Sequence, residues 1–254
     1  MQKMILTLLQ TLKTPFQSWT MMLRLLTLGS ILSGFLSGAR LAFAEDGLTS
    51  DSELWQVVTF TAPITPNKKG VFFVDGILRT QSDMQRLSLA AIRPALGYRF
   101  AEGKGLVLAG YGYLHRPWPN NAHEHHLYQQ VSYRQSLLKD HLRLTHRVRF
   151  EERYIEHEPI FPRVRLQERM EIPLNKKKTV SVVVWDEIFL NMGNSTQAVP
   201  SGFAVQRLFV GLNKRFTPAM DAEGGYMIQL VNRSEPNPNV LGHCVFLRIN
   251  FVKR

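Results

Sequence analysis

The sequence predicts an all-β protein, namely an antiparallel outer-membrane β-barrel of about 10–12 strands with short periplasmic turns and longer extracellular loops. Three observations predict this fold: regular polar–apolar alternation, unusually long extended segments and an export signal. The alternation is clearest in Leu142–Pro173, where Arg, Thr, Gln and Glu occupy every second position and mostly apolar residues lie between them. A period of two puts these sets on opposite faces of a strand.

An export signal is predicted at the N-terminus. Leu25–Ala44 is a short apolar run that follows Arg24 and ends in Ala42-Phe43-Ala44, as in a secretory signal peptide that is removed on export. We therefore expect a signal peptide at 1–44 and a single barrel domain at 45–254. Translation from Met21 or Met22 is an open alternative. An uncleaved membrane anchor is another, although the apolar core is short for a spanning helix.

The charge and cysteine content narrow the class of protein. The chain has 31 Lys and Arg against 20 Asp and Glu, a formal charge of +11. Residues 1–44 contain four basic residues and no acid, so removing them lowers the charge to +7. The remaining arginines mostly recur at every second position instead of forming a patch, which argues against nucleic-acid binding. Cys244 is the only cysteine, so no internal disulfide is expected.

Eleven extended segments of about 10–14 residues follow the signal peptide, whereas soluble strands usually have about 5–6. Tilted membrane strands need about 9–11 residues, so the lengths favour a membrane barrel over a soluble sandwich or a lipocalin-like barrel. Bacterial single-chain barrels normally have an even number of strands. We therefore also consider ten strands, without the first segment, or twelve, with a contribution from Glu45–Ser52. The segments are Glu53–Ile64, Val71–Gln81, Leu87–Phe100, Leu106–Arg116, His125–Leu137, Leu142–Ile155, Arg163–Ile172, Thr179–Asn191, Val205–Phe216, Gly224–Arg233 and His243–Val252.

The predicted connections are of two kinds. Thr65–Gly70, Ala101–Gly105, Leu138–His141, Leu174–Lys178 and Thr217–Glu223 are short, whereas Pro117–Glu124, Glu156–Pro162, Met192–Ala204 and Ser234–Gly242 are mostly longer. Every lysine after residue 44 lies in or beside a short connection or at the C-terminus. Because the flexible, hydrated ammonium suits a boundary between water and headgroups, we expect the short connections at the periplasmic rim.

A ladder of charged residues is predicted to face the lumen, because charges that face lipid cost about 2–4 kcal/mol near the bilayer midplane. We interpret it first as a structural, salt-bridged lumen. A narrow anion-preferring channel or porin is the alternative, since arginine outnumbers acid and unpaired guanidinium attracts anions. The ladder comprises Arg93, Arg134, Arg147, Arg149, Glu151, Arg153, Arg163, Arg165, Arg169, Glu171, Glu187, Arg207 and Arg248.

An enzyme is the alternative from another class. An outer-membrane lipid hydrolase would need a nucleophile and a base near the lipid, and His146 lies on the apolar phase of its segment. No Ser–His pair follows from the spacing, so we predict no catalytic residue. His123, Glu124, His125 and His126 have metal-ligating side chains, but adjacent loop residues more often form a solvated tip. We therefore predict no metal and no cofactor.

The C-terminal segment alternates cleanly. Val245, Leu247, Ile249 and Phe251 face one way, and Phe246, Arg248 and Asn250 face the other. An amphipathic last strand with an aromatic near its end is similar to the signal that outer-membrane barrels present to the barrel-assembly machinery. The expected partners are this machinery, outer-membrane lipids and small anions, with no nucleic acid. The expected state is a monomer in the outer membrane of a Gram-negative bacterium.

Short motifs along the whole predicted barrel resemble a bacterial family of predicted outer-membrane barrels, the domain-of-unknown-function family numbered 2490. The chain departs from the family pattern at His126 and Tyr128, where the family tends to carry Arg and Trp. The resemblance implies the fold and the location but no activity. The matching positions are Trp55, Arg93-Pro94-x-x-Gly97-Tyr98, Gly110-Tyr111-x-Tyr113, Glu124, Tyr128-Gln129-Gln130, Arg147-x-Arg149-x-Glu151-x-Arg153, Arg163-x-Arg165, Glu187-x-Phe189-x-Asn191, Arg207, Gly211, Gly225-Tyr226-x-x-Gln229 and His243.

Overall fold

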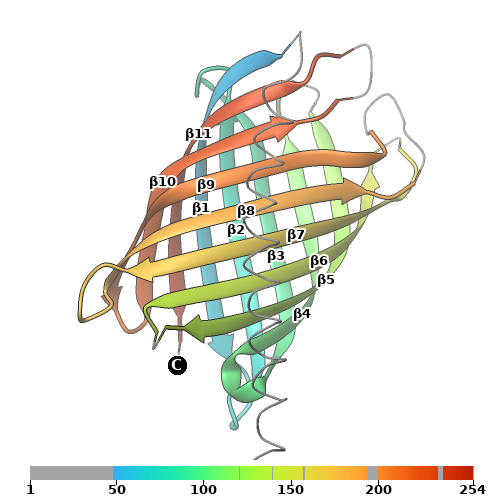
Figure 1. Ribbon diagram of the computed structural model, residues 1–254. Helices are drawn as coiled ribbons and strands as arrows, with labels where there is room; N and C mark the ends of the chain where they lie inside the picture. The colour runs from blue at the N-terminus through green and yellow to red at the C-terminus, as the bar shows by residue number, and fades with distance from the viewer. Residues whose placement is uncertain are drawn as a thin grey trace, which may run out of the picture. The chain divides into compact units, whose positions relative to one another are not determined.

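The computed structural model describes residues 48–253, except 120, 139, 157, 194–199 and 234–236. The predicted signal peptide at 1–44 lies outside the described residues. Eleven strands form a closed barrel (Figure 1), and a 3-10 turn, η1 (Ala101–Gly103), connects β3 to β4. Among the residues that the structure describes, no helix is long and apolar enough to cross a membrane.

The strands agree closely with the predicted segments, and all eleven belong to the wall. Each is long, because the polar–apolar alternation continues over its whole length. The strands are β1 (Thr49–Pro63), β2 (Gly70–Gln81), β3 (Arg86–Phe100), β4 (Gly105–Arg116), β5 (Ala122–Leu137), β6 (Leu142–Ile155), β7 (Phe161–Pro173), β8 (Val180–Asn191), β9 (Gly202–Thr217), β10 (Met220–Val231) and β11 (Val240–Val252).

The barrel closes through a parallel pair. β1 pairs with β11 from Thr49↔Val240 to Thr61↔Val252, while every other neighbouring pair is antiparallel. The predicted antiparallel barrel is therefore confirmed in ten of the eleven strand pairs, and the seam is the exception, because an odd number of alternating strands brings the first and last together in the same direction. β1 begins at Thr49, so part of Glu45–Ser52 extends the first strand and does not form a twelfth.

The two ends of the barrel differ. We call the end that holds connections 64–69, 101–104, 138–141, 174–179 and 218–219 the turn end, and the opposite end the loop end. The longest connections, 192–201 and 232–239, lie at the loop end, as predicted, but 82–85, 117–121 and 156–160 there are no longer than some turns. Lys139 lies outside the described residues. The lysines that the structure describes all lie at the turn end: Lys68, Lys69, Lys104, Lys176, Lys177, Lys178, Lys214 and Lys253.

The alternation separates an apolar outer face from a mixed inner face. On β11, Val245 and Leu247 are 42% and 46% exposed, whereas Phe246 between them is 6% exposed. The predicted orientation of this strand is therefore confirmed. The same contrast recurs around the wall, and the outward, exposed apolar residues include Val58, Phe60, Leu78, Ile92, Leu96, Val107, Leu127, Val131, Val148, Leu166, Val210, Leu212, Ile249 and Phe251.

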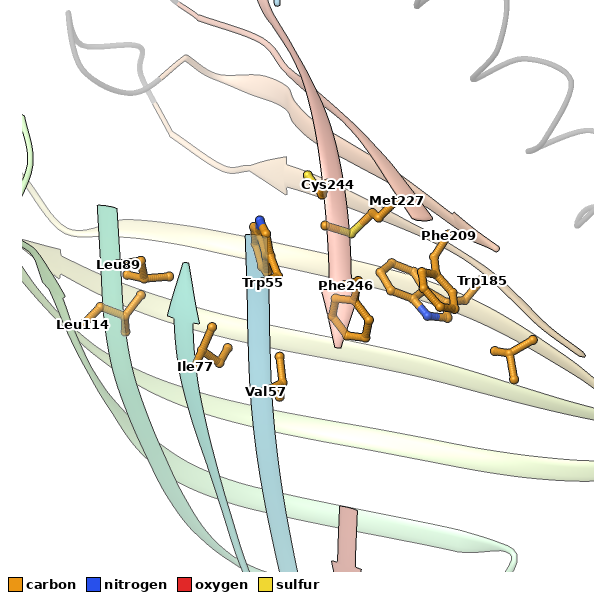
Figure 2. Close-up of a cluster of buried hydrophobic side chains, with 11 residues drawn as sticks. Trp55, Val57, Ile77, Leu89, Leu114, Trp185, Phe209, Met227, Cys244 and Phe246 are labelled. Carbon is orange, nitrogen blue, oxygen red and sulfur yellow. The ribbon is translucent and has the colours of Figure 1, made fainter. Parts of the chain in front are cut away.

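One side of the interior is apolar. Trp55 on β1 lies near Phe246 on β11, and the rings of Trp185 and Phe209 stack with centroids 5.1 Å apart (Figure 2). Val57, Ile77, Leu89, Leu114, Val183, Met227 and Cys244 complete this cluster. The residues come from β1–β4 and β8–β11. The pairing of β1 with β11 makes these strands one continuous part of the wall, although they are distant in sequence.

Glycines on the inner face make room for large side chains. A Cβ on Gly110 of β4 would lie 2.5 Å from the carbonyl oxygen of Pro94 and 2.6 Å from Cζ of Tyr128. A Cβ on Gly112 would lie 2.1 Å from Nε2 of His126. These two glycines therefore let His126 and Tyr128 of β5 lie flat over β4.

Replacing Gly110 by alanine should overpack this wall. We expect Gly110→Ala to lower the free energy of unfolding by about 1–3 kcal/mol, because the added methyl meets backbone and ring atoms that cannot retreat. Urea titration of the detergent-folded protein measures this change. Gly76→Ala is the matched control, since its Cβ would have only the carbonyl oxygen of Ala91 nearby, at 3.9 Å. Equal losses in the two variants would contradict the packing argument.

Candidate functional site: the arginine-lined lumen

The lumen has two chemically different walls. The inner face of β5, β6 and β7 carries a dense array of arginine and glutamate, and the apolar cluster of Figure 2 lies on strands of the other side. A cavity of about 560 Å³ lies between them and is lined by both kinds of residue. This cavity is the candidate functional site.

The structure places the predicted ladder on the inner face. Glu151 and Arg153 are buried beside the cavity and do not line it. The other members line the cavity: Arg93, Arg134, Arg147, Arg149, Arg163, Arg165, Arg169, Glu171, Glu187, Arg207 and Arg248.

Two buried glutamates organise the middle of the charged wall. Glu151 accepts a hydrogen bond from Nε of Arg163 at 2.7 Å and one from Arg165 at 3.0 Å. Glu187 lies 2.6 Å from Arg165 and 3.4 Å from Arg207, and it also pairs with Arg147. Arg165 therefore links the two carboxylates into one network, in which each buried carboxylate is compensated by more than one guanidinium.

A second network crosses the lumen toward the turn end. Arg169 of β7 approaches Glu223 of β10 to 2.5 Å, and Arg248 of β11 lies 2.9 Å from the same carboxylate. Nε1 of Trp185 donates to Glu223 at 3.3 Å, which joins the network to the apolar cluster. Arg143 pairs with Glu171 at 3.0 Å near the turn end of the same side. The contacts of Glu223 with Arg169 and Trp185 join strands that are not neighbours, whereas the pairs Arg248–Glu223 and Arg143–Glu171 join adjacent strands.

Five lumenal acids were absent from the predicted ladder. Asp75 receives a bidentate pair from Arg93 at 2.7 and 2.8 Å, and Glu124 lies 2.7 Å from both Arg116 and Arg153. The other three are Glu53 and Glu223, which are fully buried, and Asp221, which lines the cavity. Each lies on the inward phase of a strand with few other charges. A single acid on the phase that points inward was the available signal.

Arginine still exceeds acid after these additions. Thirteen arginines line the cavity, and Arg153 pairs with Glu124 beside it, whereas eight carboxylates serve all fourteen, an excess of six. The lining arginines are Arg79, Arg93, Arg116, Arg134, Arg143, Arg147, Arg149, Arg163, Arg165, Arg169, Arg207, Arg215 and Arg248. The carboxylates are Asp75, Glu171, Glu187 and Asp221 of the lining, and Glu53, Glu124, Glu151 and Glu223 paired to it.

A row of polar residues crosses the outward phase of β6–β9. Nδ1 of His146 lies 2.5 Å from Glu168, which is directly opposite it on β7. Glu168 pairs in register with Asp186 of β8, and Nε2 of Gln206 on β9 donates to both oxygens of Asp186 at 3.2 and 3.3 Å. Glu168 thus places a carboxylate beside the imidazole of His146, a contact that the sequence did not predict. The presence of this acid among the apolar, outward residues of β7 could have indicated the contact from the sequence.

The histidine-rich stretch of β5 is divided by the alternation. His126 and Glu124 are buried on the inner face, whereas His123 and His125 contact the outward Tyr113 and Tyr111. The side chains therefore do not converge on one point. Within the described part of the chain, no group of three or more His, Cys, Asp or Glu is placed to hold a metal ion.

The amino-acid sequence matches the model of one protein family over most of the barrel. The family model described as "Protein of unknown function (DUF2490)" matches residues 52–240, which include ten of the eleven strands apart from their ends. The chain belongs to this family. An uncharacterized protein of Methylorubrum extorquens is 27% identical over 218 residues, covering 84% of this chain and 91% of that protein.

Two solved structures are partly similar to the chain, with low TM-scores and low sequence identity. The NanC porin matches with a TM-score of 0.43 at 9% identity, over 72% of this chain and 91% of the porin. OmpT of Vibrio cholerae matches with a TM-score of 0.37 at 10% identity, over 67% of this chain and 61% of that protein.

Removing one buried carboxylate should destabilise the charged wall. We expect Glu187→Gln to lower the free energy of unfolding by about 3–5 kcal/mol, because Arg147, Arg165 and Arg207 would lose a shared counter-charge without regaining water. Urea denaturation followed by tryptophan fluorescence measures the change. Glu102→Gln, in the exposed turn η1, is the control and should unfold like the parent. An unchanged midpoint for Glu187→Gln would show that the network adds no stability.

Proposed function

We propose that this protein is a narrow, anion-preferring channel that spans a bacterial outer membrane. The closed barrel and its apolar outer face support the membrane location, since a closed sheet satisfies every strand edge and only apolar side chains suit lipid. The lysines at the turn end support a periplasmic position for that end.

The excess of six arginines along the cavity carries the proposal. A lumen with uncompensated guanidinium charge concentrates anions and repels cations. The side chains of Arg116 at the loop end and Arg248 toward the turn end are 33% and 29% exposed, whereas those of Arg149 and Arg165, which also line the cavity, are only 2% and 7% exposed. An accessible arginine toward each end, with a tight middle, fits a narrow path better than a wide water-filled pore.

A structural role for the ion pairs is compatible with this function. Glu187 and Glu151 each join arginines from neighbouring strands, which braces β6, β7, β8 and β9 against one another. The paired charges would hold the wall, and the surplus arginines would select the solute. The ion pairs therefore belong to the same proposal as the channel.

The proposal assigns no catalysis. The residues paired with His146 on its neighbouring strands are Tyr133 and Glu168, neither of which is a serine, threonine or cysteine nucleophile. We further propose that outer-membrane lipids surround the barrel, that the barrel-assembly machinery reads β11, and that the protein works as a monomer without a cofactor.

Ion selectivity tests the channel. The protein is placed in a planar bilayer under a KCl gradient. We expect single-channel steps and a reversal potential that is shifted from zero toward the equilibrium potential of chloride. Arg134→Gln combined with Arg215→Gln should shift this potential toward zero, because both arginines line the cavity and neither has an ion-pair partner among the described residues. Lys68→Gln with Lys69→Gln, outside the lumen, is the control and should leave it unchanged. Cation selectivity, or no steps at all, would contradict the proposal.

The outward polar row tests the membrane location. Changing His146, Glu168 and Asp186 together to leucine should raise the urea midpoint of the protein folded into lipid vesicles, because polar groups that face lipid are costly. The comparison variant is Glu102→Leu with Glu156→Leu, in connections between strands, which should not raise it. A triple variant that is less stable in vesicles than the parent would contradict a lipid-facing position for the row.

A further inference from the structure

We infer that the lumenal cavity binds an amphipathic anion, whose anionic group contacts Arg149 and whose apolar body lies on the facing wall. This inference rests on the proposed function, because it names the class of solute that an anion-preferring lumen would take. Three observations carry it: an under-compensated buried arginine, an apolar wall in the same cavity and a cavity of suitable size.

Arg149 has the poorest counter-charge among the buried arginines of the inner wall. Its side chain is 2% exposed, and Nε and Nη2 donate to the neutral amide oxygen of Gln130 at 2.9 and 2.7 Å. Its nearest carboxylate, Glu151, is 3.7 Å away, and the same glutamate already pairs with Arg163 and Arg165. A buried charge with so little compensation favours a bound counter-ion.

Two N–H groups on the β6 part of the charged wall have no hydrogen-bond partner among the described residues and could donate to a bound anion. Nη1 of Arg149 and Nε of Arg147 are buried and have no hydrogen-bond partner among the described side chains and backbone. Both residues lie on the inner face of β6 and line the cavity. By contrast, Arg93 on the neighbouring wall is fully used by Asp75 in a bidentate pair. An anionic oxygen at Arg149 would accept the hydrogen bonds that the protein leaves unmade.

Part of the cavity lining does not suit a small hydrated ion. This part includes Ile77, Leu89, Ala91 and Leu114 on β2–β4, which would gain nothing from a water-filled lumen. Apolar surface that is exposed to water inside a barrel favours contact with an apolar part of a ligand. An amphipathic solute can pair its anionic group with the arginines and place its apolar body against the apolar part of the lining.

The size of the cavity fits this class of ligand. Small-molecule sites usually have volumes of about 300–1,000 Å³. The cavity of about 560 Å³ lies in that range. The guanidinium fork binds carboxylate, phosphate and sulfonate oxygens alike, so the shared chemistry is a planar or tetrahedral oxyanion on an apolar body.

Calorimetric titration of the full chain in nanodiscs tests the inference, with empty nanodiscs as the baseline. The probes are 1-naphthalenesulfonate, 1-naphthylmethanol with the same body but no charge, and methanesulfonate with the charge but no such body. We expect 1-naphthalenesulfonate to bind at least about tenfold more tightly than either of the others, because only this probe contacts both walls.

Two variants locate the site. Arg149→Gln should weaken binding of 1-naphthalenesulfonate by about tenfold or more, whereas Arg134→Gln, which removes the same charge from an exposed lining position, should change it little. Ala91→Phe keeps every arginine and fills the apolar side, so it should weaken the same probe even if Arg149→Gln does not fold. Heat-modifiable mobility reports the folding of each variant.

Each other result overturns the inference. Equal binding of 1-naphthylmethanol would exclude the anion site, and equal binding of methanesulfonate would exclude the apolar wall. If Arg134→Gln and Arg149→Gln weakened the binding of 1-naphthalenesulfonate equally, the positive charge of the whole lumen would account for binding, and the specific contact with Arg149 would be excluded. The channel proposal fails separately: binding without any single-channel steps would contradict conduction alone, and anion-selective conduction without discrimination among the probes would contradict the amphipathic site alone.

Discussion

The parallel pairing of β1 with β11 is the constraint on which the other features depend. It joins the two edges that eleven strands would otherwise leave open, from Thr49↔Val240 to Thr61↔Val252. A shift of one residue in this seam would turn either Trp55 or Phe246 outward, because successive side chains of the shifted strand face opposite sides. Closure in this register therefore fixes which residues share the lumen, and the cavity exists only because of it.

Closure also obliges the enclosed charges to compensate one another. Glu53, Glu124, Glu151, Glu187 and Glu223 are at most 2% exposed, and each approaches at least one arginine. Such pairs add little net stability when formed, but breaking one is costly because a lone charge stays buried. The ion pairs are thus a requirement of a charged lumen. The arginines beyond these pairs are the part that can serve a solute.

The sequence predicted the strands and their faces because both follow from local alternation. The segment Leu142–Ile155 has the same bounds in the structure, and its arginines lie on the inner face as expected. The pairing of charges could not be predicted in this way. Arg169 meets Glu223 from strands three apart, and such a contact depends on the closed shape of the wall. Glu168 and Asp186 were missed since each interrupts an apolar phase only once.

The contrast between arginine and lysine follows from the two-walled lumen. Arg207 donates to Gln229 at 2.7 Å, while its guanidinium lies 4.5 Å from the ring of Trp55 and 4.4 Å from that of Phe189. A planar, weakly hydrated cation can hydrogen-bond at its edge and stack on aromatic faces, whereas an ammonium must keep water around it. A lumen that combines charge with aromatic surface therefore favours arginine, and the described lysines remain at the turn end. The same chemistry that lets Arg207 join the two walls would let a ligand with an anionic group and an apolar body lie between them.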